Sequence, residues 1–271
     1  MAKLAREDVV VTTPAFPAAQ DINFAAELAG RLGIAFRPRR KDTVSRLVRR
    51  CGARAALVAG SQKIYLVHDK REYGFHPGMA LQRMHALKSG KKDRLVEAAG
   101  LKSGDAFLDC TCGLGADAVV AAYAVGEKGC VRALEASSLL ASIVGFGLSG
   151  YTHKDQDMVR AMRRIQVLNR DYARALPELE TDSLDVVYFD PMFEEAVPKA
   201  RSMDLVHLLA RGYPPGAEAI REALRVARRC VVIKDRSPGD FLRSLDIPVI
   251  SDKKRLCYGR LDALSPSGSS R

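Results

Sequence analysis

The sequence predicts an α/β fold in which helices cover both faces of a doubly wound, mostly parallel sheet. Short apolar runs of strand length alternate with segments of helical periodicity over most of the chain. A glycine-rich turn joins the apolar run 106–110 to the helix expected at 116–125, and the next apolar run ends in the carboxylate Glu135. Such alternation favours parallel pairing, because each helix returns the chain to the edge where the previous strand began.

Residues 1–75 have the pattern of a small α/β domain of their own. Its expected elements are strands at 9–13, 34–37, 55–59 and 63–67 and helices at 22–32 and 44–51. Asp21 is the expected N-cap of the first helix and Gly33 its end, while Thr43 or the preceding Asp42 begins the second helix.

Residues 76–264 are expected to form the larger domain, and the Ser-, Gly- and Pro-rich tail 265–271 is expected to be flexible. The expected strands of this domain are 106–110, 130–135, 165–169, 184–190 and 230–234. The expected helices are 79–88, 95–99, 116–125, 138–148, 155–164, 203–211 and 216–228.

The composition is that of an ordinary globular protein with an excess of positive charge. Of 271 residues, 47% are hydrophobic and 28% are charged, and 43 Lys and Arg exceed 32 Asp and Glu by +11. This excess favours a polyanionic partner such as nucleic acid, because each neutralised phosphate releases condensed counterions. A surface charge that only solubilises the protein is the alternative.

The six cysteines do not have the spacing of a zinc site, since Cys110 and Cys112 form C-x-C and no second pair matches them. We therefore expect reduced thiols and no metal. The N-terminus lacks the apolar core of a signal peptide, and no apolar run approaches the roughly 18 residues that span a bilayer. A cytoplasmic protein without a membrane partner is expected.

The turn after the strand 106–110 has the character of a nucleoside-cofactor site. Glycines at 113 and 115 allow a tight turn and a close approach of ligand to backbone, and the following helix offers free N–H groups. The carboxylate of Glu135 is placed to accept hydrogen bonds from ribose hydroxyls. Gly113, Gly115 and Ala118 also fit the weak G-x-G-x-x-A fingerprint of NAD enzymes, and a purely structural glycine turn is the alternative.

Two acids favour a methyl donor over a dinucleotide. Asp109 ends its strand inside the loop, where it can bind the ammonium group of a methionine moiety but would repel a pyrophosphate. Asp171 follows the third strand of this domain, where it can bind the adenine amino group or act as the N-cap of the next turn.

The tetrapeptide Asp190-Pro-Met-Phe193 follows the strand 184–190 and is related to the (D/N)-P-P-(Y/F) loop of methyltransferases that act on exocyclic amines. The lone pair of an aromatic amine is delocalised into the ring, so acceptors that hold the NH2 group favour attack. Asp190 and a carbonyl near Pro191 are the expected acceptors, proline fixes the loop, and Phe193 stacks on the base. A strand-ending turn with a core Phe is the alternative.

Other candidates are weaker. Lys234 and Asp235 follow the fifth strand and are interpreted as a surface pair, with contact to RNA phosphate or bracing of the Asp190 loop as alternatives. The histidines show no metal-type spacing, and none is expected to be a catalytic base.

Together, Leu108–Asp117, Glu135 and Val187–Phe193 resemble the bacterial 16S rRNA guanine-N2 methyltransferase family and its Gram-positive relatives. The resemblance covers roughly residues 75 to 236, with D-P-M-F as its most specific element. It implies a seven-stranded class I methyltransferase fold, S-adenosyl-L-methionine as cofactor, and transfer to the 2-amino group of guanine in small-subunit rRNA.

The resemblance also implies which residues line the sites. The cofactor residues are expected to be Asp109, Thr111, Gly113, Gly115, Ala116, Asp117, Glu135, Ala136, Asp171, Tyr172 and Asp190, and the catalytic residues Asp190, Pro191 and Phe193. Two departures are visible: Ala116 stands where the family usually has arginine, and Glu194 where a proline commonly follows.

Three other functions are compatible with these residues. DNA, protein or a small molecule can be methylated with the same cofactor site. A non-catalytic RNA-binding protein can retain the fold, although intact Asp190 and Glu135 argue against it. An NAD-dependent oxidoreductase is the third alternative.

Overall fold

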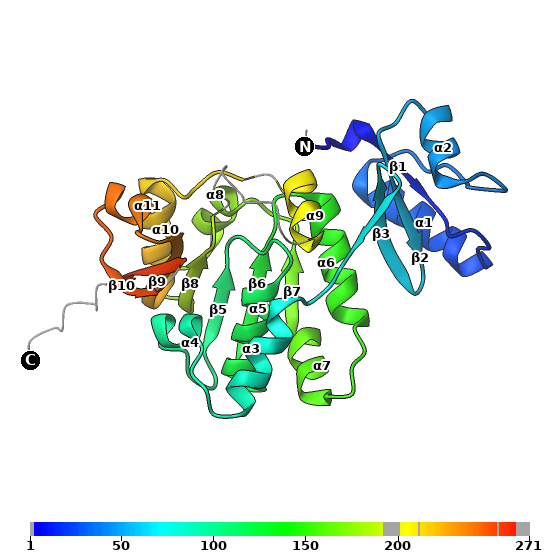
Figure 1. Cartoon of the computed structure of the whole chain (residues 1–271). Helices are drawn as coiled ribbons and strands as arrows, with labels where there is room; N and C mark the ends of the chain where they lie inside the picture. Colours follow the sequence, from blue (N-terminus) through cyan, green and yellow to red (C-terminus); the bar gives the residue numbers. More distant parts are fainter. Residues whose placement is uncertain (1–2, 192–200, 211, 254, 264–271) are drawn as a thin grey trace, which may run out of the picture. The chain divides into compact units, whose positions relative to one another are not determined.

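The computed structural model describes residues 3–191, 201–210, 212–253 and 255–263 (Figure 1). Phe193 and the tail 265–271, for which the sequence makes predictions, lie outside these residues. The chain forms two compact units. The first comprises Met1–His76, Ser137–Gly150 and Val197–Ala210, and the second Pro77–Ala136, Tyr151–Ala196 and Arg211–Arg271.

The first unit is built on a four-stranded sheet with the order β1-β2-β3-β4. Its strands are β1 (Val9–Thr12), β2 (Ala55–Gly60), β3 (Lys63–His68) and β4 (Arg71–Gly74), and its helices α1 (Ala19–Leu32), α2 (Val44–Arg50), α6 (Ser138–Gly150) and α9 (Arg201–Leu209). β1 and β2 are parallel and the other pairs antiparallel. α1 packs on β1 and β2, and α6 packs on β3.

Three details of this unit differ from the sequence-based expectation. α1 begins at Ala19, and Asp21 is not its N-cap but accepts a hydrogen bond from the Ala18 N–H at 3.0 Å and from the Ser61 N–H at 2.8 Å. The possible strand at 34–37 is only a single bridge from Phe36 to Val11. β4 was not expected, because its short sequence has no apolar alternation and its pairing with β3 supplies the order.

The second unit contains a seven-stranded sheet with the order β10-β11-β9-β8-β5-β6-β7, which confirms the predicted doubly wound fold. Its strands are β5 (Ala106–Asp109), β6 (Cys130–Leu134), β7 (Ile165–Leu168), β8 (Leu184–Phe189), β9 (Ala227–Arg236), β10 (Val249–Lys253) and β11 (Leu256–Asp262). The five strands β7, β6, β5, β8 and β9, neighbours in that order, are parallel. The strand β11 is antiparallel to both β9 and β10.

The helices of this unit cover both faces of the sheet (Figure 1). They are α3 (Met79–Lys88), α4 (Arg94–Ala99), α5 (Ala116–Val125), α7 (Gln156–Arg163), α8 (Tyr172–Ala175), α10 (Ala217–Val226) and α11 (Asp240–Ser244). Side chains alternate between faces along a strand, so Phe107 and Leu108 point in opposite directions. Phe107 stacks on Tyr188, whose hydroxyl reaches α5, while Leu108 belongs to the core on the α10 side.

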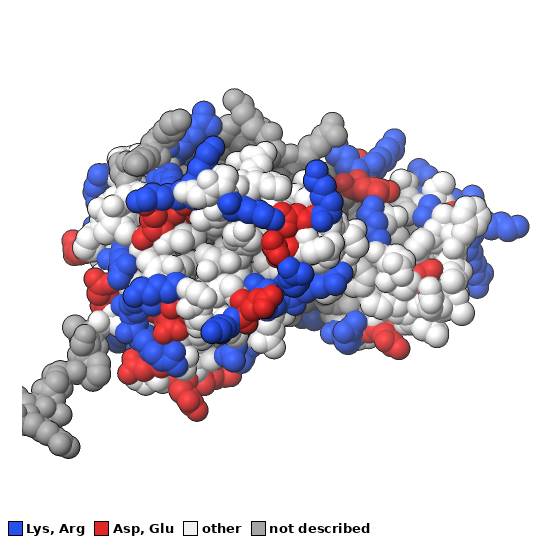
Figure 2. Space-filling view, turned by 90° about the horizontal axis from the view of Figure 1, so that it is seen from below, with Lys and Arg blue, Asp and Glu red and all other residues white. Residues whose placement is uncertain are grey.

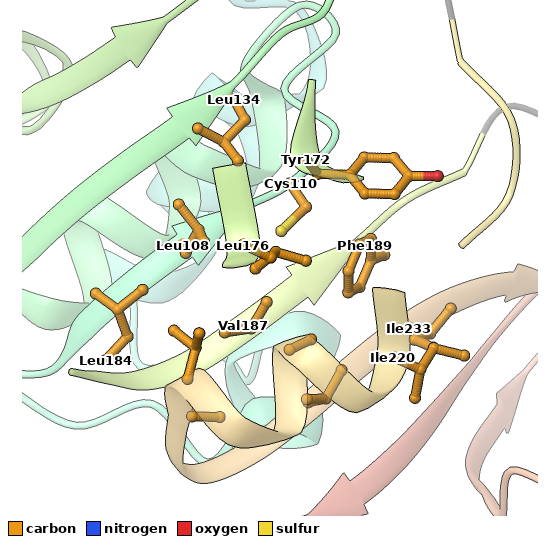
Figure 3. Close-up of a cluster of buried hydrophobic side chains, with 14 of the residues drawn as sticks. Leu108, Cys110, Leu134, Tyr172, Leu176, Leu184, Val187, Phe189, Ile220 and Ile233 are labelled. Atoms are coloured by element: carbon orange, nitrogen blue, oxygen red, sulfur yellow. The ribbon is translucent and has the colours of Figure 1, made fainter. Parts of the chain in front are cut away.

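Figure 3 shows the core on the α10 side, where the labelled side chains converge from the sheet, α8 and α10. Leu108, Val187 and Phe189 come from adjacent central strands, and Ile220 projects from α10. Their burial removes apolar surface from water, at about 25 cal/mol for each Å². This core fixes the strands whose ends carry the candidate site.

The strands β10 and β11 and the helix α11 were not located from the sequence. Gly259 interrupts the apolar pattern of β11, and polar residues dominate β10. A Cβ at Gly259 would lie 2.6 Å from Leu242 and 2.7 Å from Ile247, so the glycine is needed for the close packing of β11 under the α11 region.

Among the described residues, no helix has the length and apolarity to cross a membrane.

Candidate cofactor and catalytic site

The chemically distinctive residues of the second unit lie at one edge of its sheet. Asp109 ends β5, Glu135 follows β6, Asp190 follows β8, and Lys234 lies near the end of β9. These four strands are parallel, so their carboxyl ends share an edge. The chain order reverses between β5 and β8, and ligands of open α/β sheets bind beside such a switch point.

Local hydrogen bonds of backbone N–H groups hold the loop between β5 and α5 in its conformation. The Asp109 carboxylate accepts a hydrogen bond from the Thr111 N–H at 2.9 Å, and the Gly115 N–H donates to the Cys112 carbonyl at 2.7 Å. Gly113 and Gly115 have φ of 53° and 75°, the left-handed region that favours glycine. Gly115 is the N-cap of α5, so the loop leads into a helix N-terminus at Ala116.

Glu135 connects this loop to the end of β6. Its side chain is buried, and its Oε2 accepts a hydrogen bond from the Gly113 N–H at 3.1 Å. The Asn169 side chain donates to the carbonyls of Glu135 at 2.8 Å and Ala136 at 3.2 Å, which ties the ends of β6 and β7 together. A carboxylate at the end of the strand beside a glycine loop is the acceptor that ribose hydroxyls require.

Asp109 is almost fully buried, with 1% of its surface exposed. Burial raises the pKa of Asp109 to about 8, and the nearby carboxylates of Asp117 and Asp190 act in the same direction. The protonated form of Asp109 therefore predominates at neutral pH. A cation placed beside it favours the ionised form.

Asp117 is the centre of a buried network of charges. Its carboxylate binds the guanidinium of Arg83 from α3, the Lys234 Nζ at 2.9 Å and the Tyr188 hydroxyl at 2.9 Å. Arg83 also binds Asp93, the N-cap of α4, through two hydrogen bonds of 2.8 and 2.9 Å. Burial raises the pKa of Asp117, but Lys234 and Arg83 outweigh it and hold the pKa well below its usual value.

Lys234 joins this network to Asp190. Its Nζ lies 2.7 Å from Asp190 Oδ2, and only 15% of the Lys234 side chain is exposed. The interpretation of Lys234 as a surface cation is therefore wrong, and the alternative that it braces the Asp190 loop is confirmed. Burial lowers the pKa of Lys234, but the carboxylates of Asp117 and Asp190 outweigh it and raise the pKa above its usual value.

Asp190 is held at its backbone and at its side chain. Its N–H donates to the Thr111 Oγ1 at 2.6 Å, which fixes the end of β8 against the glycine loop. Its side chain is 37% exposed, so one edge of the carboxylate remains accessible. Burial of the rest and the proximity of Asp117 raise the pKa of Asp190, against the opposing effect of Lys234. Pro191, the next residue, is buried.

Asp235 has a structural role. It is 4% exposed, and its carboxylate accepts hydrogen bonds from the Arg236 N–H at 2.6 Å and the Leu242 N–H at 3.2 Å. Asp235 therefore ties the end of β9 to α11. The interpretation of Asp235 as part of a surface pair is wrong, because its oxygens bind the backbone inside the fold.

The structure places Asp171 and Tyr172 beside β7 but not in the charge network. The Asp171 carboxylate caps α8 by accepting from the Ala173 N–H at 2.8 Å, which agrees with the N-cap alternative and leaves its second oxygen for other partners. The Tyr172 hydroxyl donates to the Tyr213 carbonyl at 2.7 Å, and its ring packs edge-on against Phe189.

Three features of the site were missed or left open by the sequence. Arg83 and Asp93 lie far from the motifs in the chain, and only tertiary folding brings them to Asp117. A lysine in the apolar strand β9 was the one available signal for Lys234.

In the part of the chain that the structure describes, no group of three His, Cys, Asp or Glu residues is arranged to hold a metal.

Comparison with known proteins was consistent with this geometry. Residues 47–258 match the model of a family described as putative SAM-dependent methyltransferase. A Bacillus subtilis protein named "Uncharacterized protein YpiP" is 36% identical over 258 residues, covering 95% of this chain and all of that protein. Ribosomal RNA small subunit methyltransferase J of Nitrosococcus oceani is 32% identical over 84% of this chain and 89% of its own length.

Among solved structures, a SAM-dependent methyltransferase from Neisseria gonorrhoeae shares the fold. It superposes with a TM-score of 0.61 over 93% of this chain and 95% of its own, at 16% sequence identity. At that identity the similarity concerns the fold alone.

Proposed function

Because the chain belongs to the family of SAM-dependent methyltransferases, we propose that it methylates an exocyclic amine of a base, the guanine N2, in small-subunit rRNA. The cofactor of the family is S-adenosyl-L-methionine, which supplies an electrophilic methyl group when bound. The observation that carries the proposal is the position of Asp190, a partly exposed carboxylate fixed beside the glycine loop by Thr111 and Lys234.

The described residues fit this cofactor. Gly113 and the helix N-terminus at Ala116 offer backbone N–H groups, Glu135 offers a carboxylate at the end of β6, and Asp109 offers a buried acid that a cation would ionise. We propose that Thr111, Gly115, Ala136, Asp171 and Tyr172 complete the binding site. Asp117 already binds three side chains, so its proposed contribution is to hold Lys234 and the start of α5.

The proposed catalytic groups act on the attacking amine. Asp190 accepts a hydrogen bond from the NH2 group and orients its lone pair towards the methyl donor. The Lys234 ammonium and the Thr111 hydroxyl limit the freedom of Asp190, and such positioning supplies much of the rate in a methyl transfer. Pro191 contributes a rigid turn. Phe193, outside the described residues, is proposed to stack on the base.

The choice of RNA as substrate has two supports. Several relatives are named ribosomal RNA small subunit methyltransferase J, and the chain has a net charge of +11. A ribosomal substrate also agrees with the cytoplasmic location expected from the sequence.

The test has two stages. Calorimetric titration with S-adenosyl-L-methionine and, separately, with NAD measures whether the first alone binds saturably. Transfer of a tritiated methyl group is then measured on isolated small ribosomal subunits, on deproteinised small-subunit rRNA and on DNA. The proposal requires a labelled guanine, identified by nuclease digestion and chromatography. Label in DNA or protein only, or in another base, would overturn the substrate assignment while leaving the family unchanged.

A further inference from the structure

The positive charge of the protein is concentrated in one short segment of the first unit. Residues 37–54, here called the basic segment, contain eight cations and one acid, a net charge of +7. The cations are Arg37, Arg39, Arg40, Lys41, Arg46, Arg49, Arg50 and Arg54. Of the total of +11, only +4 therefore remains for the other 253 residues. On the face shown in Figure 2, cations and acids are interspersed.

The cations of the basic segment point to solvent. All except Arg39 are exposed, whereas Leu47 on the opposite side of α2 is fully buried. Arg46 and Arg50 are one helical turn apart and so lie on the same face of α2. The fold thus uses α2 to present guanidinium groups in a row.

The single acid neutralises only part of this charge. Asp42 binds Arg50 and, at 3.4 Å, Arg46. Arg54 binds Asp8 at 3.1 Å. Within the described residues, the other four exposed cations form no ion pair: Arg37, Arg40, Lys41 and Arg49. Seven of the eight cations are arginines, whose planar guanidinium binds phosphate through two hydrogen bonds, which is the preference of an RNA-binding surface.

Arg40 has an unusual backbone conformation. It lies at the tip of the turn Arg39–Asp42 with φ of 52°, a region in which glycine or asparagine is favoured. The side chain of Arg40 is exposed at this tip.

A concave site adjoins the same cations. A pocket of about 830 Å³ is lined by Arg6, Arg37 and Arg50, by the single acid Glu7, and by apolar residues that include Ile34. Guanidinium groups beside apolar side chains suit a nucleotide, whose base is flat and apolar and whose phosphate is anionic.

We propose that the basic segment and this pocket form an RNA-docking surface of the first unit. The inference rests on the proposed function for the identity of the polyanion, and it assigns to this unit the binding of the RNA backbone. Phosphate contacts position a substrate without reading its sequence. Recognition of the target base is left to the second unit.

The test uses the full chain and fluorescence anisotropy. The probes are a fluorescein-labelled 20-nucleotide oligouridine and deproteinised small-subunit rRNA. The test variant combines Arg37→Gln, Arg40→Gln and Arg49→Gln. The matched control combines Lys102→Gln, Lys128→Gln and Arg163→Gln, which removes the same charge from exposed positions before β5, β6 and β7.

We expect the test variant to bind both RNAs about tenfold or more weakly at roughly 0.1 M salt. The slope of log affinity against log salt should fall by roughly 2, as for three lost contacts to a single strand. The control should change by less than about threefold, because distant surface charges are screened at this ionic strength. Equal losses in both variants, or none in the test variant, would overturn the inference.

Two further measurements separate this inference from its alternatives. If the test variant loses binding to phosphatidylserine vesicles but retains RNA affinity, the surface binds membranes and the inference fails. Wild-type protein that binds RNA through the basic segment but transfers no methyl group would refute the proposed function alone. Normal transfer with an unchanged KM for RNA in the test variant would refute the docking surface alone.

Discussion

Asp190 has its position determined by two neighbours and its chemistry by a third. Thr111 fixes its N–H, and Lys234 binds one carboxylate oxygen. Burial and the nearby Asp117 raise the pKa of Asp190, against the opposing effect of Lys234. A carboxylate in this setting is a stronger hydrogen-bond acceptor than one in free solution, because fewer water molecules compete for it. The residue is therefore suited to hold an amine.

Asp190→Ala should reduce methyl transfer by at least about 100-fold, because the amine loses its acceptor and its orientation. Asp190→Asn keeps an acceptor oxygen and should retain more activity than the alanine variant. Single-turnover transfer measures both rates, and calorimetry with S-adenosyl-L-methionine checks that the cofactor still binds. Undiminished turnover of the alanine variant would remove Asp190 from the mechanism.

Asp109 makes stability depend on pH in an unusual direction. Its pKa is about 8 in the folded protein and about 3.9 in an unfolded chain, so the folded state binds the extra proton between these values. The free energy of unfolding should fall as pH rises from 5 to 8, by up to about 1.4 kcal/mol for each pH unit from this group. Below pH 4 the contribution is fully present.

Asp109→Asn removes this dependence because asparagine does not ionise. Urea unfolding of both proteins at pH 5, 7 and 8 should show the variant gaining on the wild type as pH rises. A constant difference across this range would mean that Asp109 is already ionised in the folded protein. Cofactor binding at pH 7 should release a proton from wild type, detectable by calorimetry in two buffers, and less from the variant.

At the scale of elements, Arg83 fastens α3 to the rest of the second unit. Its guanidinium bridges Asp93 at the start of α4 and Asp117 at the start of α5. Both acids are buried, and Arg83 is one of two cations that bind Asp117. One side chain from the middle of α3 thereby connects the starts of two other helices near the candidate site.

Arg83→Met should lower the free energy of unfolding by about 3–5 kcal/mol, because it leaves two buried carboxylates with too few cations. Arg83→Lys is the matched control, since it retains the charge and loses only the two-pronged geometry, and it should be less destabilising. Urea unfolding gives both values. Equal stability of the methionine variant and the wild type would show that water compensates these acids.

The sequence predicted the elements of the parallel sheet well, because each is a continuous apolar run followed by a helix. It also placed Gly113, Glu135 and Asp190 at one edge of this sheet, since the ends of parallel strands share an edge, while their roles stay predictions. It did not predict β4, β10 and β11, whose order comes from antiparallel pairing rather than from their own patterns. The charge network around Asp117 could not be predicted from the sequence either, because Arg83 and Lys234 come together only in the folded chain.

At the scale of the whole molecule, the cofactor and the fold should be coupled. S-adenosyl-L-methionine at about 100 times its Kd should raise the free energy of unfolding by about 2.7 kcal/mol if it binds the folded state alone. Thermal unfolding with and without the cofactor measures this increase, and NAD at the same concentration should have no effect. Stabilisation by NAD instead would contradict the cofactor assignment.

The division into domains at 1–75 and 76–264 stays a prediction. The compact units interleave along the chain, because Ser137–Gly150 and Val197–Ala210 belong with the N-terminal residues. Chain connectivity and spatial grouping are therefore different descriptions of this protein. Domain boundaries drawn from sequence position alone describe only the chain connectivity.

This interleaving limits how the protein can be dissected. A fragment that starts at Pro77 would retain α6 but lose two of its packing partners, β3 and Phe24, and would expose apolar side chains such as Phe146, whose ring lies 5.4 Å from that of Phe24. Such surfaces promote aggregation, which light scattering of the fragment would detect. The N-terminal unit is thus not a detachable accessory, and its loss by truncation, in the laboratory or in evolution, would remove a partner on which the remaining chain depends.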